Sequence, residues 1–309
     1  MNYTHYITLF YCLQDNDMNY KIKIIFFLFS LIGLIAAWDY KDVDSWKKEF
    51  PQCGGKQQSP INLDQIDLFD DTGEKLNFQS YHIRPVKMTL SNNGHTLELK
   101  PEWDDAYGPP TVTVQGIEYQ LQSLHFHWGL SDDRGSEHIF VNDLRTSLEM
   151  HIVHHNPEFG DFDNKNGDAI LVVGILFEIG KYSNALWEIL DYAYAVQEPE
   201  SASVEIEPFQ ISDFLDENSF DYYISYTGSL TTPPCTEGVT WIVLIPSIEV
   251  STSQMEIFRS IKLNHEDDHN NRPVQPINDR TPGKIGFLIY EQSWFVNWNA
   301  WFFFLPEFK

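Results

Sequence analysis

Residues 124–129, Leu-His-Phe-His-Trp-Gly, constrain the fold more than any other stretch, because two histidines alternate with large apolar side chains. In a β-strand, side chains point alternately to opposite faces. His125 and His127 therefore share one face, while Phe126 and Trp128 lie on the other. Such a His-x-His pair is also common in strands that bind no metal, so further ligands are needed before it indicates a metal site.

Strand-like runs dominate the chain and predict a mainly β fold with a few short helices. They lie at 111–114, 119–128, 137–141, 148–154, 169–179 and 239–245. We expect one helix near 185–196 and another after Ser253, where Ser253-Gln-Met-Glu256 has the pattern of a capping box. No repeat or Gly/Ser-rich linker divides residues 38–280, which predicts a single domain there.

Composition and charge exclude several classes of partner. Of the 309 residues, 42% are hydrophobic, enough for a large core. The 20 basic and 45 acidic residues give a net charge of −25, with the acids scattered along the chain. Nucleic acids and anionic membranes are bound by clustered Lys and Arg, so neither is expected as a partner. The aromatic tail, 281–309, is interrupted by Asn297 and Asn299, so we expect no membrane anchor and leave its role open.

The N-terminus predicts export. Lys21 and Lys23 precede a mostly apolar run at 24–37, which is shorter than the ~20 residues that a membrane-spanning helix needs. We interpret 1–37 as an N-terminal extension and signal peptide, with the start of translation at the first or the second methionine left open. The sequence therefore predicts a secreted or extracellular protein.

Two cysteines, Cys53 and Cys235, remain once residues 1–37 are removed. An even pair in a secreted chain favours a disulfide over two unrelated buried thiols. Closing a loop of about 180 residues would stabilise the fold by roughly 5 kcal/mol on the chain-entropy model.

A third histidine, His151, extends the candidate metal site. It lies in the apolar run 147–155, with Glu149 two residues earlier on the same strand face. If this strand lies beside the first, His125, His127 and His151 offer three nitrogen ligands and leave a fourth position open. That arrangement is typical of a catalytic Zn²⁺ site. A ligating imidazole needs a partner on its outer nitrogen, and Glu149 could supply it.

Seven short motifs occur in order along the chain: Gln58-Ser-Pro-Ile-Asn62, Asn92-Asn-Gly-His95, Leu124–Gly129, Gly135-Ser-Glu-His138, Glu149-Met-His-Ile-Val-His154, Gly228-Ser-Leu-Thr-Thr-Pro-Pro234 and Arg272-Pro-Val-Gln-Pro276. Each is weak alone, but together they make the chain, from Trp38 to about Asp279, resemble the α-class carbonic anhydrases. The resemblance implies a large, mostly antiparallel twisted central sheet, a metal site at the bottom of a conical cleft, and a Cys53–Cys235 bridge of the kind seen in extracellular members. It also implies reversible hydration of carbon dioxide to bicarbonate and a proton by attack of zinc-bound hydroxide.

The same resemblance implies roles for further residues. Thr231 accepts a hydrogen bond from the zinc-bound hydroxide, while its own hydroxyl donates to Glu137. His95 matches the histidine that relays the proton to bulk water, although a histidine after Asn-Gly is also an ordinary turn residue. The positions that match the substrate pocket are Leu230, Thr232, Val153, Val172, Val239 and Trp241. For each apolar one taken alone, core packing is the more common role.

The sequence departs from the family pattern in two places. Ser123 stands where the family commonly has a glutamine that supports the first zinc histidine. A serine hydroxyl is shorter than a glutamine amide, so we expect weaker support for His125. The interval from Glu137 to His151 is one residue longer than expected, which predicts an extra residue in the 142–146 turn.

Two other classes of function fit parts of the chain. His265-Glu-Asp-Asp-His269 matches the H-E-x-x-H pattern of zinc proteases, but its acidic residues favour a solvated loop over a metal-binding helix. The other alternative is a catalytically weak, carbonic-anhydrase-like extracellular binding domain. In such domains one or more zinc histidines are replaced, whereas this chain retains all three together with Thr231 and Glu137, which favours an enzyme. The sequence leaves the oligomeric state undetermined.

Overall fold

The computed structural model describes residues 38–65, 76–139, 144–199, 201–215, 222–280 and 283–286. From Asp39 onward these residues belong to one structural unit. The expected signal peptide, most of the aromatic tail and part of the 142–146 turn lie outside the described residues. Within the described part of the chain, no helix is both long and apolar enough to cross a membrane.

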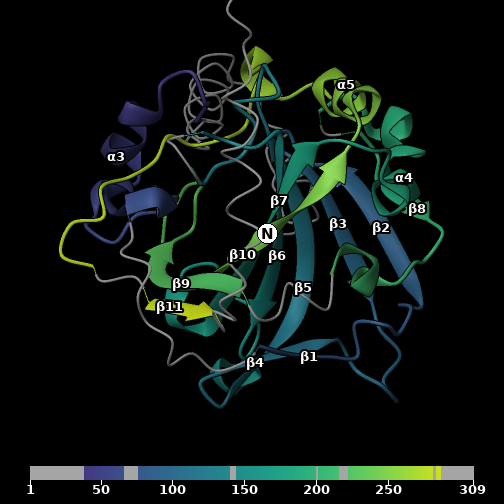
Figure 1. The fold of residues 1–309 in the computed structure, drawn as a ribbon, viewed down its shortest axis with the longest axis horizontal. Coiled ribbons are helices and arrows are strands. Elements are labelled where there is room, and N and C mark those ends of the chain that lie inside the picture. Colours follow the sequence, from purple (N-terminus) through teal and green to yellow (C-terminus); the bar gives the residue numbers. More distant parts are fainter. Residues whose placement is uncertain are drawn as a thin grey trace, which may run out of the picture. The chain divides into compact units, whose positions relative to one another are not determined.

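Among the described residues, eleven strands form one twisted sheet. They are β1 (Asn77–Gln79), β2 (Lys87–Asn92), β3 (Leu97–Glu102), β4 (Thr111–Val114), β5 (Ile117–Trp128), β6 (Leu148–His155), β7 (Ile170–Ile179), β8 (Val204–Ile206), β9 (Tyr222–Ser229), β10 (Glu237–Val250) and β11 (Gly283–Gly286). Their order is β11-β9-β10-β7-β6-β5-β3-β2-β8, and β4 joins β1 to β5. β10 pairs parallel with β7, and the other neighbouring strands pair antiparallel. The expected mainly β, mostly antiparallel fold is therefore confirmed (Figure 1).

Short helices connect and flank these strands. The α-helices are α3 (Trp46–Glu49), α4 (Asn184–Leu190) and α5 (Thr252–Ser260). The 3₁₀ helices are η1 (Val43–Ser45), η2 (Pro51–Gly54), η3 (Leu63–Gln65), η4 (Pro157–Phe159), η5 (Gly167–Ala169), η6 (Ala193–Val196), η7 (Ile211–Phe214) and η9 (Asn264–Glu266). α4 and α5 lie next to each other (Figure 1).

Both helix predictions were right in position and wrong in detail. Ser251 is the N-cap of α5, so the capping box pairs Ser251 with Gln254 and not Ser253 with Glu256. The Ser251 hydroxyl accepts the Gln254 N–H at 3.3 Å, and the Gln254 side chain accepts the Ser251 N–H at 3.2 Å. The helix expected at 185–196 is divided into α4 and η6.

The strand predicted at 137–141 does not form in the part that the structure describes, where Ile139 makes only an isolated bridge. The backbone N–H groups of Glu137 and His138 instead donate to one carboxylate oxygen, Oε2 of Glu149, each at 2.8 Å. A backbone donor engaged by a buried carboxylate is not available to a neighbouring strand. This segment therefore becomes part of a polar site and not of the sheet.

Alternation along β6 separates the main core from a second face of the sheet. Every residue of β6 is buried. Met150 and Ile152 belong to the larger apolar cluster, which Phe258 of α5 joins. Val153 belongs to a smaller apolar cluster. Because side chains alternate between faces, His151 shares the face of Val153 and lies opposite the main core.

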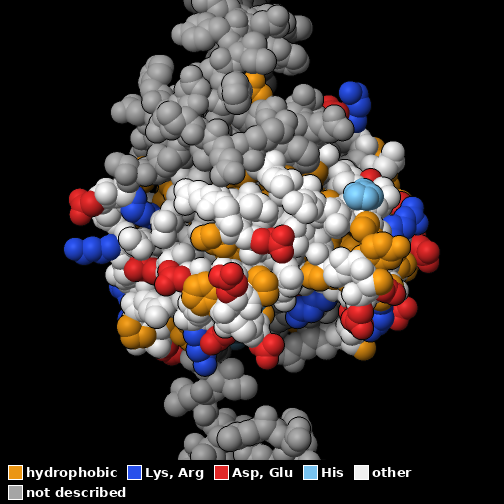
Figure 2. Space-filling view, turned by 90° about the horizontal axis from the view of Figure 1, so that it is seen from below, with side chains coloured by type: hydrophobic (Ala, Val, Ile, Leu, Met, Phe, Trp, Pro, Cys, Tyr) orange, Lys and Arg blue, Asp and Glu red, His pale blue; other side chains and the backbone are white. Residues whose placement is uncertain are grey.

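The surface carries mixed charges. On the face shown in Figure 2, Asp and Glu side chains are interspersed with Lys and Arg and with single hydrophobic side chains. This agrees with the scattered acidic residues of the sequence. On this face the Lys and Arg side chains are therefore dispersed and not gathered into one patch.

The burial of His154 is expected to make the stability of the fold depend on pH. It is buried beside Tyr81, whose hydroxyl is bonded to the His154 Nε2. Burial lowers the pKa of His154 from 6.5 to about 3. Between these values the unfolded chain binds a proton that the folded chain does not. The free energy of unfolding is therefore expected to fall as the pH decreases from about 6.5 to about 3, by up to about 5 kcal/mol from this residue.

Urea unfolding of the wild type and His154→Gln at about pH 7 and about pH 4, at equal metal content, measures this contribution. The loss of stability between the two pH values should be smaller in His154→Gln. The same loss in both proteins would show that His154 does not carry the effect.

Candidate metal centre

The structure brings the three predicted histidines together. β5 and β6 pair so that His125 lies directly opposite His151. The imidazole centroids are 5.1 Å apart for His125 and His127, 5.1 Å for His125 and His151, and 4.4 Å for His127 and His151. One nitrogen from each ring lies within 4.8 Å of the others. The three histidines therefore converge because of the register between β5 and β6, which could only be assumed from the sequence.

Hydrogen bonds on the outer nitrogens orient two of the rings. The Nδ1 of His127 lies 2.7 Å from the carbonyl oxygen of Asn270. The Nε2 of His151 lies 2.8 Å from Oε1 of Glu149, the partner expected from the sequence. The other nitrogen of each ring, Nε2 of His127 and Nδ1 of His151, is therefore available to bind a metal ion in the space between the rings.

This donor set fits a zinc ion. The Nε2 of His127 is buried and has no hydrogen-bond partner among the described residues, which costs free energy unless another group binds it. Burial is the main cause that lowers the pKa of both His125 and His127. Neutral imidazoles are the form that binds a metal. Three imidazole nitrogens with an open fourth position match a catalytic zinc site.

Glu149 is the centre of a buried polar network. Burial alone would raise its pKa, but the charges and hydrogen bonds of His138 and His151 hold the pKa of Glu149 well below its usual value. His138 Nδ1 lies 2.6 Å from Glu149 Oε1, and His138 Nε2 lies 2.8 Å from the Tyr226 hydroxyl. The group His138, Glu149 and His151 is therefore a hydrogen-bonded chain that fixes a ring of the metal centre. The side-chain atoms that could bind a second metal ion here form hydrogen bonds with one another.

Sequence reasoning missed His138, Tyr226 and Asn270. His138 lies in the Gly135-Ser-Glu-His138 motif, and that motif was the available signal. Asn270 acts through its backbone carbonyl, 143 residues away from His127 along the chain. A backbone acceptor leaves no trace in the residue type, so only the fold reveals it.

Glu137 lies at the edge of the three rings. Its Oε1 accepts the backbone N–H of Arg272 at 2.9 Å and lies 3.3 Å from His127 Nδ1. Its Oε2 is buried, has no hydrogen-bond partner in the part of the chain that the structure describes, and lies 3.9 Å from His151 Nε2. No Thr231–Glu137 hydrogen bond is found in the described part of the chain, although Thr231 is also buried. The Glu137 carboxylate is thus held in place by the Arg272 N–H, and its Oε2 can still accept a hydrogen bond.

The residues expected to hold the substrate lie together. Val153, Val172, Val239 and Trp241 belong to the smaller apolar cluster, with Leu230 packed against it. The Trp241 ring lies 4.8 Å from the His151 ring. Thr232 is partly exposed and follows Leu230 and Thr231 directly in the chain. An apolar wall therefore borders the histidines.

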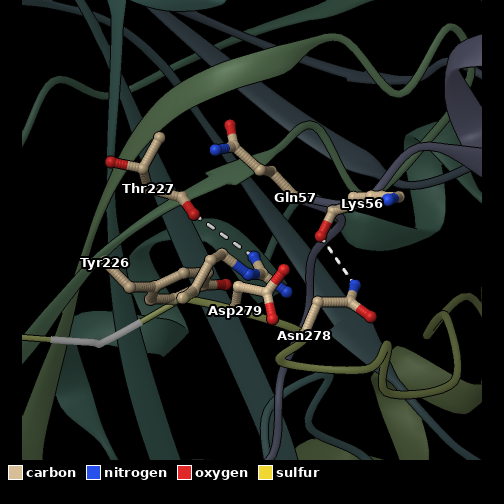
Figure 3. A pocket seen from close by; sticks show the side chains of 7 residues that line it. Lys56, Gln57, Tyr226, Thr227, Asn278 and Asp279 are labelled. Atoms are coloured by element: carbon tan, nitrogen blue, oxygen red, sulfur yellow. Dashed lines mark hydrogen bonds between the residues drawn. The ribbon is translucent and has the colours of Figure 1, made fainter.

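A pocket of about 400 Å³ opens beside the Tyr226 ring (Figure 3). Its lining residues are Lys56, Gln57, Tyr226, Thr227, Asn278, Asp279 and Arg280. Asn278 Nδ2 donates to the Lys56 carbonyl at 2.7 Å, and Arg280 Nη1 donates to the Thr227 carbonyl at 3.2 Å. None of the residues predicted to act in the reaction lines this pocket, so we do not assign it to the reaction.

Cys53 and Cys235 form the expected disulfide, across 182 positions of the chain. Cys235 directly follows the 228–234 motif, and Cys53 is in η2. The Cys53 carbonyl also accepts a hydrogen bond from Arg272 Nη2 at 3.1 Å. The bridge therefore joins the N-terminal part of the described chain to the segment that carries Thr231.

His95 lies half-buried in the turn between β2 and β3. Its carbonyl accepts a hydrogen bond from Asn270 Nδ2 at 3.0 Å, which connects this turn to the residue that orients His127. Burial, and then the charge of His265, lower the pKa of His95 to about 4. This is below the near-neutral value expected of a proton relay.

Ser123 does not replace the missing support for His125. It lies on the strand face of His125 and is buried, but no hydrogen bond joins the two side chains in the described part of the chain. Within the described residues, the outer nitrogen of His125 therefore lacks the kind of partner that Asn270 and Glu149 give the other two rings.

We predict that Ser123→Gln slows the loss of zinc to a chelator, because an amide can reach the His125 ring. An outer partner of this kind typically changes metal affinity by about 10 to 100-fold. The hydration rate at saturating zinc should change little. Equal zinc-release rates in Ser123→Gln and the wild type, at the same chelator and pH, would show that the serine is a neutral replacement.

Comparison with known proteins agrees with this geometry. A model of the eukaryotic-type carbonic anhydrase family matches residues 41–282, and the chain belongs to that family of zinc-dependent enzymes, which interconvert carbon dioxide and bicarbonate. It is similar to carbonic anhydrase 6 of Bos taurus, with 33% identity over 84% of this chain and 83% of that protein. The Mus musculus relative of the same name is 32% identical over 84% and 82% of the two chains, and the Canis lupus familiaris relative is 33% identical over 79% of each.

The zinc-protease motif does not form a metal-binding helix. η9 covers Asn264–Glu266 and contains His265 with a non-helical φ of 58°. The His269 Nδ1 lies 2.7 Å from its neighbour Asp268. The interpretation of this stretch as a loop is therefore confirmed, although Asp267 within it is buried and not solvated.

Proposed function

We propose that the chain binds one Zn²⁺ through His125 Nε2, His127 Nε2 and His151 Nδ1 and catalyses the reversible hydration of carbon dioxide. The observation that carries this proposal is the convergence of three imidazoles, two of them held by outer hydrogen bonds with their other nitrogens inward. When bound, the zinc ion supplies an activated water at neutral pH.

The chain's own residues would aim and shelter the reaction. Glu137 is fixed by the Arg272 N–H and keeps a buried acceptor oxygen. We propose that the Thr231 hydroxyl donates to this oxygen in the loaded enzyme, which leaves the Thr231 oxygen to accept a hydrogen bond from the attacking hydroxyl group. Val153 and Trp241, with the other apolar residues of the smaller cluster, exclude water and hold the apolar substrate. Thr232 is proposed to contact bicarbonate.

We also propose that the protein is secreted, with 1–37 removed, 38–280 as the catalytic domain and 281–309 as a separate tail. The Cys53–Cys235 disulfide supports an oxidising compartment. N-terminal sequencing of protein collected from the medium of expressing cells tests this, and a chain that remains in the cytosol with residues 1–37 attached would contradict it. The site gives no support to the alternative of a catalytically weak binding domain, because all three histidines expected to bind zinc are retained.

Stopped-flow measurement of CO₂ hydration tests the proposed function. The mature protein should hydrate carbon dioxide, and an aromatic sulfonamide should inhibit it, because the deprotonated sulfonamide nitrogen can occupy the fourth zinc position. A zinc-loaded, folded protein with no hydration above the buffer rate would refute the proposal and favour the binding domain.

We predict that His95→Ala lowers kcat in weak buffer and leaves kcat/KM nearly unchanged, because the relay acts after bicarbonate has formed. Imidazole added to the solvent should restore the rate by accepting the proton that leaves the site. If turnover in weak buffer is the same with and without the His95 ring, another group or a water path carries the proton.

A further inference from the structure

A second histidine lies next to the proposed relay. The Gly94 carbonyl accepts the backbone N–H of Asn264 at 2.7 Å. Gly94 has a φ of +85°, and a Cβ there would lie 2.0 Å from Asn264 Nδ2, so the two turns contact closely. The residues that follow, His95 and His265, are therefore neighbours across this contact although they are far apart in sequence.

The two imidazoles differ in exposure. His95 is half-buried, whereas His265 is exposed to solvent. They are close enough that the charge of His265 lowers the pKa of His95, after the larger effect of burial. A proton on the His95 ring is thus unfavourable on two counts, and an exposed imidazole next to it offers a route to water.

The residues around His265 leave its imidazole ring free to exchange a proton with solvent. Lys41 Nζ donates to the His265 carbonyl at 2.5 Å, which holds the backbone and not the ring. Glu266 follows it on the surface, and the Asp267 carboxylate accepts the Tyr40 N–H at 3.0 Å. His269 is bonded to Asp268. No described residue forms a hydrogen bond with the His265 ring.

We propose that His265 is a second proton-relay group, which takes the proton from His95 and delivers it to bulk solvent. The His95 imidazolium loses an N–H proton, directly or through water, and the neutral His265 ring gains it. His95 is then neutral again, and the His265 imidazolium passes the proton to buffer. This inference rests on the proposed hydration of carbon dioxide, and it gives a use to the first histidine of the protease-like motif.

His265→Asn is the decisive variant, because asparagine tolerates the left-handed backbone at this position. In weak buffer we expect kcat to fall about fivefold, less than the 10²–10⁴-fold that a single proton-transfer group typically contributes. The value of kcat/KM should not change, and imidazole should restore kcat. In a His95→Ala background the same substitution should have no further effect. His82→Asn, which removes another exposed histidine, is the matched control.

An NMR titration of the His95 ring gives a readout that does not depend on activity. In His265→Asn the pKa of His95 should rise, because a neighbouring positive charge is removed, and in His82→Asn it should not. An unshifted His95 titration, an unchanged kcat, or equal falls in kcat and kcat/KM in an active enzyme would overturn the relay and leave the proposed function intact. A wild type that does not hydrate carbon dioxide would overturn both.

Discussion

His151→Ala is expected to abolish both zinc binding and CO₂ hydration. The substitution removes one of three converging nitrogens, so zinc affinity should fall by more than the 10 to 100-fold that follows loss of an outer partner. It also takes a hydrogen bond from the buried Glu149, which costs roughly 1–3 kcal/mol, so the fold must be checked by circular dichroism.

Metal analysis and stopped-flow hydration measure the two losses. His82→Ala, in which an exposed histidine outside the site is removed, should keep wild-type zinc content and rate. If folded His151→Ala retains stoichiometric zinc and full activity, His151 is not a ligand.

The second large effect is on stability. Replacing both Cys53 and Cys235 with alanine should lower the free energy of unfolding by about 5 kcal/mol, because the bridge closes a loop of 182 residues in the unfolded chain. A typical domain has only about 5–15 kcal/mol in total, so this variant should be near the limit of folding.

Denaturant unfolding of the oxidised wild type and the double variant measures this difference. Reduction of the wild type should produce a comparable loss, and the same reductant should leave the double variant unchanged. The mature, denatured and unreduced protein should contain no titratable thiol. Two free thiols in it would refute the bridge.

The alternation of residue types made much of the fold predictable. His125 and His127 alternate with Phe126 and Trp128, and the same two-residue period places His151 opposite the core face of β6. These positions depend only on strand geometry, which the residue pattern reports directly. The pairing of β5 with β6 did not follow from the pattern, but it was the simplest way to complete the site.

The predictions of secondary structure were wrong where a side chain, and not a neighbouring strand, binds the backbone N–H groups. The segment 137–141 has strand-like residues, yet the Glu149 carboxylate binds the N–H groups of Glu137 and His138. In α5, both Ser251 and Ser253 precede a suitable third residue, and only the fold decides which one caps the helix. The contacts of Glu149 with residues 137 and 138, and of Asn270 with His127, join residues far apart in sequence, and the local sequence pattern does not report them.

The central claim is that the three histidines form one zinc site that carries out CO₂ hydration. It is tested most directly by adding Zn²⁺ in steps to the metal-free protein while the hydration rate is measured. The rate should rise in proportion to added zinc and stop rising at one equivalent per chain. Hydration activity in the metal-free protein, or one tightly bound equivalent of zinc with no gain in rate, would contradict the account.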